Sequence, residues 1–295
     1  MALTKRDVLK HQQAVPWTTQ RQVEQDLILC QSMIALFEDD FLKTHIAMRG
    51  GTLLHKVHLS PAARYSEDID LVIVGDRPED HISLAIRHVL FQTLGKPTRS
   101  KWEELKLAVR NAVKPNKVLR ETYHVKSVID PAGKPLEIVI EVNATERKPY
   151  MEIAELPFNL KHQNQTSQTM IRGFDIHEML GTKMRALFQR TRGRDLFDLY
   201  WAMTETSTPI DKTKVIDAFV HYMEQEKSDA TRDDFISAMD SKLADQGFLT
   251  DMKPLLREGL TYDPIIAGKY VTNNLLMLLP DGAQPAAPVK KSHRP

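Results

Sequence analysis

The sequence has little of several features that mark particular classes of protein. Its 295 residues include one cysteine, Cys30, which excludes an intramolecular disulfide and a zinc site built from cysteines; we expect it to be a core residue. No uninterrupted apolar run exceeds the five residues of Leu275–Leu279, whereas a membrane-spanning helix needs ~20. Residues 1–20 lack the apolar core of a signal peptide. We therefore expect a protein of the cytoplasm without a membrane partner.

An excess of charge of one sign is also missing. The chain has 40 Lys and Arg against 39 Asp and Glu, so its net charge is +1 and any nucleic acid must be held by a local patch. The composition, 42% hydrophobic and 27% charged, is that of a globular protein with one large or two modest domains.

Apolar spacing predicts a mixed α/β arrangement in the first half of the chain. Spacings of four and three between apolar residues predict a long helix over Val23–Phe41. A short strand over His45–Met48, a break at Gly50 and a helix from Thr52 should follow. The β-branched run Ile69–Val74 predicts a buried strand, and a helix should come next.

The second half is predicted to be helical after one further hairpin. Two strands, Tyr123–Ile129 and Ile138–Val142, flank a turn. The polar stretch Lys161–Thr169 suits a linker, so we expect a domain of residues 1–165 and a helical domain of residues 166–280. Asp175 and Glu178 could form a capping box at the start of that domain, and residues 281–295 should be a disordered tail.

The motif richest in chemistry contains Asp68 and Asp70 at the start of the buried strand. Alternation along a strand places both carboxylates on one face. Two such acids repel each other unless a cation lies between them, and hard oxygen ligands suit Mg²⁺ bound with substrate phosphates. The alternative is a pair of solvated acids, which is the commoner outcome for an isolated Asp-x-Asp.

Two further features give that motif a context. Gly50 and Gly51 allow backbone N–H groups to approach an anion, although paired glycines alone more often form an ordinary turn. A third carboxylate can come from Glu137 or Glu141 on one face of the later strand, and Glu137 better fits its exposed side.

Several blocks in this order resemble the AbiEii/AbiGii-type nucleotidyltransferase toxins of type IV toxin–antitoxin systems, within the polymerase-β-like nucleotidyltransferase superfamily. The resemblance covers residues 27–201 and implies a nucleotidyltransferase α/β (α+β) fold with a small mixed sheet, followed by a helical C-terminal domain. It also implies NTP and Mg²⁺ as co-reactants, transfer to RNA, with tRNA as the expected acceptor, and a cognate antitoxin encoded nearby. The blocks are Gly50-Gly51-Thr52, Arg64-x-Ser66-Glu67-Asp68-Ile69-Asp70, Ile140-Glu141-Val142-Asn143, Lys183 and Arg194-Asp195-Leu196-x-Asp198-Leu199.

The resemblance also implies roles for individual residues. Metal ligands would be Asp68, Asp70 and Glu141. Catalytic residues would include these three together with Lys183, Asp195 and Asp198, and the nucleotide would be bound by Gly50, Gly51, Thr52, Arg64, Ser66 and Lys183.

Pattern alone offers simpler explanations for the later residues. Lys183 could extend along an apolar helix face to solvent. Asp195 and Asp198 could be acids at the start of a helix, where the dipole favours them, with Asp198 paired to Arg194.

Basic residues gather in two runs, which favour an RNA acceptor. Residues 96–126 contain nine basic and three acidic residues, and residues 183–194 contain five basic residues and no acid. A solvated helix face is the simpler explanation of each run alone. Rival functions are a small-molecule nucleotidyltransferase and a catalytically silent nucleic-acid-binding protein.

Overall fold

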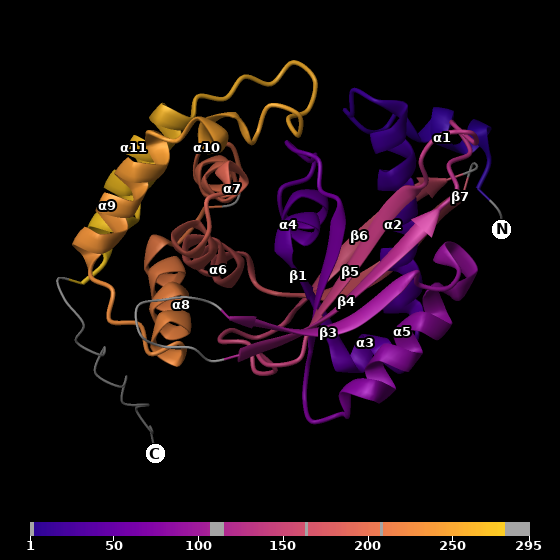
Figure 1. The fold of residues 1–295 in the computed structure, drawn as a ribbon, viewed down its shortest axis with the longest axis horizontal. Helices are drawn as coiled ribbons and strands as arrows, with labels where there is room; N and C mark the ends of the chain where they lie inside the picture. The colour runs from indigo at the N-terminus through magenta and orange to yellow at the C-terminus, as the bar shows by residue number, and fades with distance from the viewer. Residues whose placement is uncertain (1–2, 107–114, 163–164, 207–208, 281–295) are drawn as a thin grey trace.

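The fold combines one mixed sheet with helices on both of its sides (Figure 1). The structure, a computed structural model, describes residues 3–106, 115–162, 165–206 and 209–280. Helices α2, α3 and α5 lie on one side of the sheet, and the helices that follow the last strand lie on the other (Figure 1). The expected tail, residues 281–295, lies outside the described residues.

The sheet has seven strands in the order β3-β4-β5-β2-β1-β7-β6. Neighbours β2 and β5 are parallel, as are β1 and β7, while the other pairs are antiparallel. The predicted hairpin is confirmed as β4 and β5, although its first strand ends at Val125 and not at Ile129. The predicted buried strand is β2. The strands are β1 (Ile46–Arg49), β2 (Asp68–Ile73), β3 (Arg99–Lys106), β4 (Pro115–Val125), β5 (Leu136–Asn143), β6 (Ala154–His162) and β7 (Gln165–Gly173).

The linker predicted over Lys161–Thr169 is wrong, because Lys161 and His162 belong to β6 and residues 165–169 belong to β7. The two strands pair through their backbones from Ala154, opposite Gly173, to His162, opposite Gln165. Polar side chains are tolerated there because the hairpin lies at the edge of the sheet and several of its side chains face water. The helical part of the chain therefore begins only at α6, and a domain boundary near residue 165 stays a prediction.

Helices of the first half follow the predicted spacing. The long helix α2 begins at Gln20, where Thr19 and Gln22 form a capping box, and it ends at Glu38, before Phe41. The helices are α1 (Lys5–His11), α2 (Gln20–Glu38), α3 (Leu42–His45), α4 (Gly50–Leu53), the π-helical turn η1 (Leu54–His58) and α5 (Glu79–Leu94).

Helices of the second half begin with α6, which Asp175 caps by accepting a hydrogen bond of 2.8 Å from the His177 N–H. The predicted capping box is not formed. Glu178 is instead fully buried and accepts hydrogen bonds from the backbone N–H groups of Tyr150 and Met151. The helices are α6 (Ile176–Gln189), α7 (Gly193–Thr204), α8 (Lys212–Gln225), α9 (Arg232–Leu243), α10 (Gln246–Thr250), α11 (Pro264–Asn274) and the 3₁₀ turn η2 (Leu276–Leu278).

A hydrophobic core joins the two halves. Apolar residues of α2, the central strands, α6 and α7 form one cluster, which includes Cys30 as predicted. Among the described helices, none combines the length and apolar character needed to cross a bilayer.

Candidate active site

Three carboxylates meet on one face of the central strands. Asp70 of β2 lies opposite Glu141 of the parallel strand β5. Asp68 lies two residues before Asp70 and therefore on the same face. In the same row Asp70 is opposite Arg49 of β1, and Glu141 is opposite Arg120 of β4. The strand register thus brings together the three acids predicted as metal ligands.

The electrostatics of this group favour a bound cation. Burial, reinforced by Asp68 and Glu141, raises the pKa of Asp70 to about 8. Burial also raises the pKa of Glu141, although Arg120, whose Nη2 lies 2.6 Å from the Glu141 carboxylate, opposes that shift. A divalent ion with oxygen ligands would relieve the repulsion, so the donor set fits Mg²⁺.

Glu137 lies apart from the three acids. Its side chain is 64% exposed and lies 3.5 Å from His124. Strand β2 begins opposite Val139, so no residue of β2 is paired with Glu137. The geometry therefore favours Glu141 over Glu137 as the third carboxylate.

Replacing each of these two glutamates by glutamine should distinguish their roles in activity. We expect Glu141→Gln to lower nucleotidyl transfer by about 100-fold or more, because it removes a charged ligand from the metal. Glu137→Gln should leave transfer within about twofold of the wild type, since its side chain faces water. Rates measured over a range of Mg²⁺ concentrations would check this; an essential Glu137 and a dispensable Glu141 would reverse the assignment.

Glycine is required at positions 50 and 51 because the backbone there lies very close to charged side chains. Gly50 has φ +78°, and a Cβ there would lie 1.8 Å from Oδ2 of Asp70. A Cβ at Gly51 would lie 2.6 Å from Nη2 of Arg64 and 3.0 Å from Oγ of Ser66. Any side chain at either position would thus displace a group of the site.

Thr52 acts as an internal brace. Its hydroxyl is fully buried, donates to the Asp68 carbonyl and lies within hydrogen-bond distance, 2.9 Å, of Oγ of Ser66. Thr52 does not line the cleft, whereas Ser66 does. Among the residues predicted to bind the nucleotide, Thr52 is therefore placed behind the binding surface.

Lys183 does not extend to solvent. Its side chain is 8% exposed, and its Nζ lies 3.1 Å from Asp195 Oδ1 and 2.9 Å from Asp198 Oδ2. Arg64 forms a bidentate pair with Asp198, with N–O distances of 2.6 and 2.7 Å. Two basic groups at the cleft are thus fixed by the same carboxylate.

Asp195 and Asp198 are fully buried behind these basic groups and do not line the cleft. Asp195 also accepts two hydrogen bonds from Arg190, at 2.7 and 2.9 Å. The predicted pairing of Asp198 with Arg194 is wrong, because Arg194 turns to Asp251 instead. Both acids are placed to position cations, and neither is placed to contact a substrate.

His55 was not predicted from the sequence, and it completes the buried network. Its Nε2 lies 2.8 Å from Asp198 Oδ1, and burial lowers its pKa from 6.5 to about 4, despite the nearby carboxylate. No motif marks this residue; only its place in η1, directly after α4, brings it to Asp198.

The neutral His55 should make the protein sensitive to acid. Between about pH 6.5 and pH 4 the unfolded chain binds a proton that the folded chain excludes, so the free energy of unfolding should fall across this window by up to ~3 kcal/mol. In His55→Gln that loss should be smaller, because the titrating group is gone. Urea unfolding from pH 7 to pH 4 measures both, and parallel curves for the two proteins would contradict the assignment.

The acids and basic groups line a cleft of about 470 Å³ between the sheet and α6. Eight of its lining residues are basic and three are acidic, a balance that suits a polyanion bound with a cation. The basic residues are Arg49, Arg64, Arg120, Lys183, Arg185, Arg190, Arg192 and Arg194.

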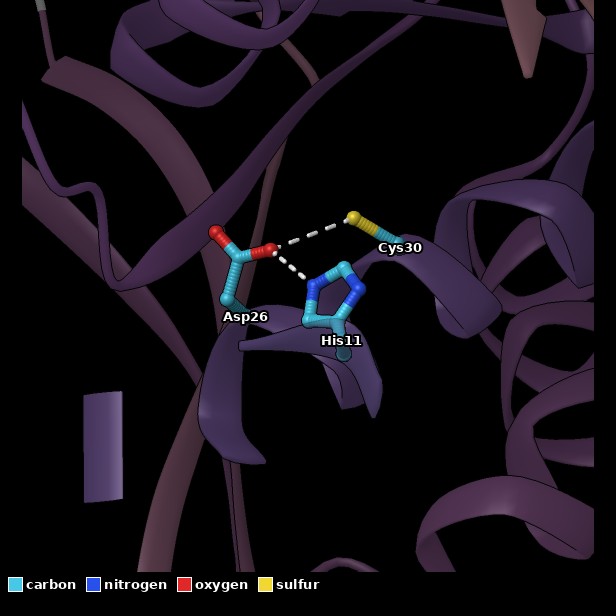
Figure 2. A group of neighbouring side chains, drawn as sticks. All are labelled: His11, Asp26 and Cys30. Carbon is cyan, nitrogen blue, oxygen red and sulfur yellow. Dashed lines mark hydrogen bonds and ion pairs between the residues drawn. The ribbon is translucent and has the colours of Figure 1, made fainter. Parts of the chain in front are cut away.

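A second group of metal-ligating types, His11, Asp26 and Cys30, lies buried away from the cleft (Figure 2). Asp26 accepts hydrogen bonds from His11 at 2.8 Å, from Cys30 and from Trp17. The ammonium of Lys56 also contacts Asp26 and supplies the cation. Burial raises the pKa of the Cys30 thiol to about 12, whereas a metal ligand must be a thiolate. This group is therefore a structural ion pair that joins α1, α2 and η1.

The fold and the cleft together define a nucleotidyltransferase. Residues 33–267 match the family described as Nucleotidyl transferase AbiEii toxin, Type IV TA system. The match covers most of the chain, so this protein belongs to the AbiEii family of nucleotidyltransferase toxins. The predicted family is confirmed.

The solved structure of one toxin agrees with this assignment at the level of the fold. MenT4, a nucleotidyltransferase toxin from Mycobacterium tuberculosis H37Rv, matches with a TM-score of 0.55 and 15% identity, over 95% of this chain and 91% of that one. JHP933 from Helicobacter pylori is 12% identical, with a TM-score of 0.42 over 93% of this chain and 95% of that one. No curated protein matches in sequence. The predicted fold class, a mixed sheet followed by helices, is confirmed.

Proposed function

We propose that the protein transfers a nucleoside monophosphate from an NTP to an RNA acceptor, with tRNA as the expected one, and thereby blocks translation as the toxin of a pair with an antitoxin encoded nearby. The observation that carries this proposal is the triad Asp68, Asp70 and Glu141 beside positioned basic side chains. The NTP and the RNA are found in the cytoplasm, which is the location that this proposal implies.

The three carboxylates would hold one or two Mg²⁺ ions. When bound, such ions polarise the α-phosphate and lower the pKa of the acceptor hydroxyl. The residues around them bind and orient the substrates. In the reaction the acceptor hydroxyl gives its proton to water, and its oxygen bonds to the α-phosphorus. The bond from that phosphorus to the bridging oxygen breaks, and pyrophosphate leaves with the electron pair.

Arg64, Lys183 and Arg190 form a basic group that we call the α7-side wall. All three are anchored by Asp195 or Asp198. Together with Gly51 and Ser66 they can bind the β- and γ-phosphates and neutralise the departing pyrophosphate. Because their anchors are buried, the wall is in place before the nucleotide arrives.

An RNA acceptor is supported by basic residues around the cleft. Arg99 and Lys101 of β3 are each 63% exposed, and Lys101 lies opposite Arg120 of β4. Arg192, beyond α6, is 59% exposed. Charges of this kind can position a phosphate backbone along the cleft.

The predicted basic run of residues 96–126 does not form one surface. Lys117 contacts Glu79 and lies 4.9 Å over the Trp102 ring, on the sheet face opposite to Arg120. Alternation along β4 separates these two side chains, which the sequence count had placed together. Arg110 and Lys114 lie outside the described residues, and the side chain of Lys106 is likewise not described.

The experiment that tests this function is incubation of the purified chain with total RNA and each of the four labelled NTPs, with and without Mg²⁺. We expect label from at least one NTP to enter RNA only when the metal is present. Labelled products confined to small molecules would favour the small-molecule enzyme. The absence of Mg²⁺-dependent NTP binding in calorimetry would favour the catalytically silent protein.

A further inference from the structure

A second basic group in the cleft has no part in the nucleotide binding proposed above. Arg49 of β1 and Arg185 of α6 both contact Glu146, and the distance from Arg185 Nη1 to Glu146 Oε1 is 2.6 Å. Although burial opposes it, the two guanidinium groups bring the pKa of Glu146 down to about 2. One carboxylate thus joins two arginines.

This group, the α8-side wall, is held rigidly. Arg185 Nη1 also lies 3.1 Å from Glu226, and its guanidinium lies 4.7 Å from the centre of the Tyr222 ring. Glu226 in turn accepts a hydrogen bond of 2.6 Å from Gln189. The side chains of Arg49 and Arg185 are 18% and 8% exposed, and both residues line the cleft. The bonds to the described carboxylates use Nη1 of each arginine, so other N–H groups can reach a ligand.

Helix α6 passes between α7 and α8 (Figure 1), and the two walls contact different ones of these neighbours. Lys183 turns to Asp195 of α7, whereas Arg185 turns to the α8 side. The sheet agrees with this arrangement, because Ser66 precedes the start of β2 and Glu146 follows the end of the parallel strand β5. The three carboxylates therefore lie between the two walls.

In-line phosphoryl transfer needs a binding site on each of two opposite sides of the α-phosphorus. The entering oxygen and the leaving pyrophosphate are roughly in line, on opposite sides of the α-phosphorus. If the α7-side wall holds the pyrophosphate, the acceptor must approach from the other side. We propose that Arg49 and Arg185 bind the phosphodiester that precedes the terminal nucleotide of the RNA acceptor. This inference rests on the proposed transfer to RNA.

The donor pattern of the α8-side wall suits a phosphodiester. A phosphodiester has two unesterified oxygens, which the remaining N–H donors of the two guanidinium groups can match. In the proposed function the α7-side wall, with three basic groups anchored on two carboxylates, already binds the pyrophosphate. A nucleobase of the NTP in the α8-side wall is the competing outcome that the test must separate.

The test compares binding of RNA and of NTP in Arg185→Gln. We expect the KM for RNA to rise ~10-fold or more through loss of one charge-assisted contact, and the slope of log KM against log salt to fall by ~0.7. The Kd for NTP, measured calorimetrically, should stay within about twofold. Arg185→Lys keeps the charge, so it should recover most of the salt slope.

A matched control is Arg172→Gln on β7. Arg172 is also a partly buried arginine, 3.5 Å from Glu155, and it does not line the catalytic cleft. Its KM for RNA and its Kd for NTP should equal those of the wild type. Thermal unfolding of each variant shows whether it is folded at the assay temperature.

A change in the RNA keeps the test independent of folding. With wild-type protein, an uncharged methylphosphonate at the last internucleotide linkage should raise the KM ~10-fold, and in Arg185→Gln it should have little further effect because the contact is already lost. A higher Kd for NTP with an unchanged KM for RNA, or additive effects of the two changes, would overturn the inference. Failure of the wild-type protein to label any RNA would instead refute the proposed function.

Discussion

Replacing Asp70 by Asn is expected to lower nucleotidyl transfer by ~1,000-fold or more and, in the absence of metal, to raise the melting temperature of the protein. Asp70 lies between Arg49 and Glu141 in the central row of the sheet, at the point where a shared cation would bind. The amide keeps the shape of the side chain but loses its charge. It also removes the cost of burying a charged group and the repulsion by Asp68 and Glu141, the two effects that raise the pKa of Asp70. The metal-free fold should therefore become more stable.

Two measurements check this prediction together. Transfer rates are compared at saturating NTP and Mg²⁺, and melting temperatures are compared in a chelator. Asp76→Asn, in the exposed turn after β2, is the matched control and should change neither quantity. A variant at Asp70 with wild-type rates would refute the metal site, whereas lower activity without stabilisation would refute only the electrostatic account.

The second large effect is expected for Asp198→Asn. We expect the free energy of unfolding to fall by about 3–5 kcal/mol, because one carboxylate compensates the buried charges of Arg64 and Lys183 and also contacts His55. Affinity for NTP should fall as well, by ~10-fold or more, because in the α7-side wall Arg64 loses its anchor and Lys183 loses one of its two carboxylate partners. Asp198 would thus act as a positioning residue.

Urea unfolding at pH 7 measures the loss of stability, and calorimetric NTP titration below the melting temperature measures the loss of affinity. Asp240→Asn, on the exposed side of α9, is the control and should leave both unchanged. Loss of stability with unchanged NTP affinity would show that Asp198 supports the fold alone. Intact stability would contradict the buried network itself.

Local rules were sufficient for the parts of the site that lie within one element. Alternation along a strand put Asp68 and Asp70 on one face, and the structure agrees because this inference depends on the geometry of a few consecutive residues. The paired glycines predicted an approach of backbone N–H groups to an anion. The structure adds a different reason for glycine, since a Cβ at Gly50 or Gly51 would meet Asp70 or Arg64.

Residues that act across elements could not be assigned from local pattern. The sequence left Glu137 and Glu141 as alternatives, and only the parallel register of β5 beside β2 places Glu141 next to Asp70. The pattern of Lys161–Thr169 predicts a linker instead of the end of the β6–β7 hairpin, because polar residues at a sheet edge show no apolar alternation.

The sequence by itself thus determined the family to which the protein belongs, and it supplied in order along the chain the acids and glycines that line the cleft. Only the tertiary structure decided which charges are paired. Arg64 meets Asp198 across 134 residues, and His55 meets it across 143. The Glu146 carboxylate that joins Arg49 and Arg185 was not predicted either. Buried ion pairs depend on how helices pack against the sheet, and no periodicity along the chain encodes a partner so far away.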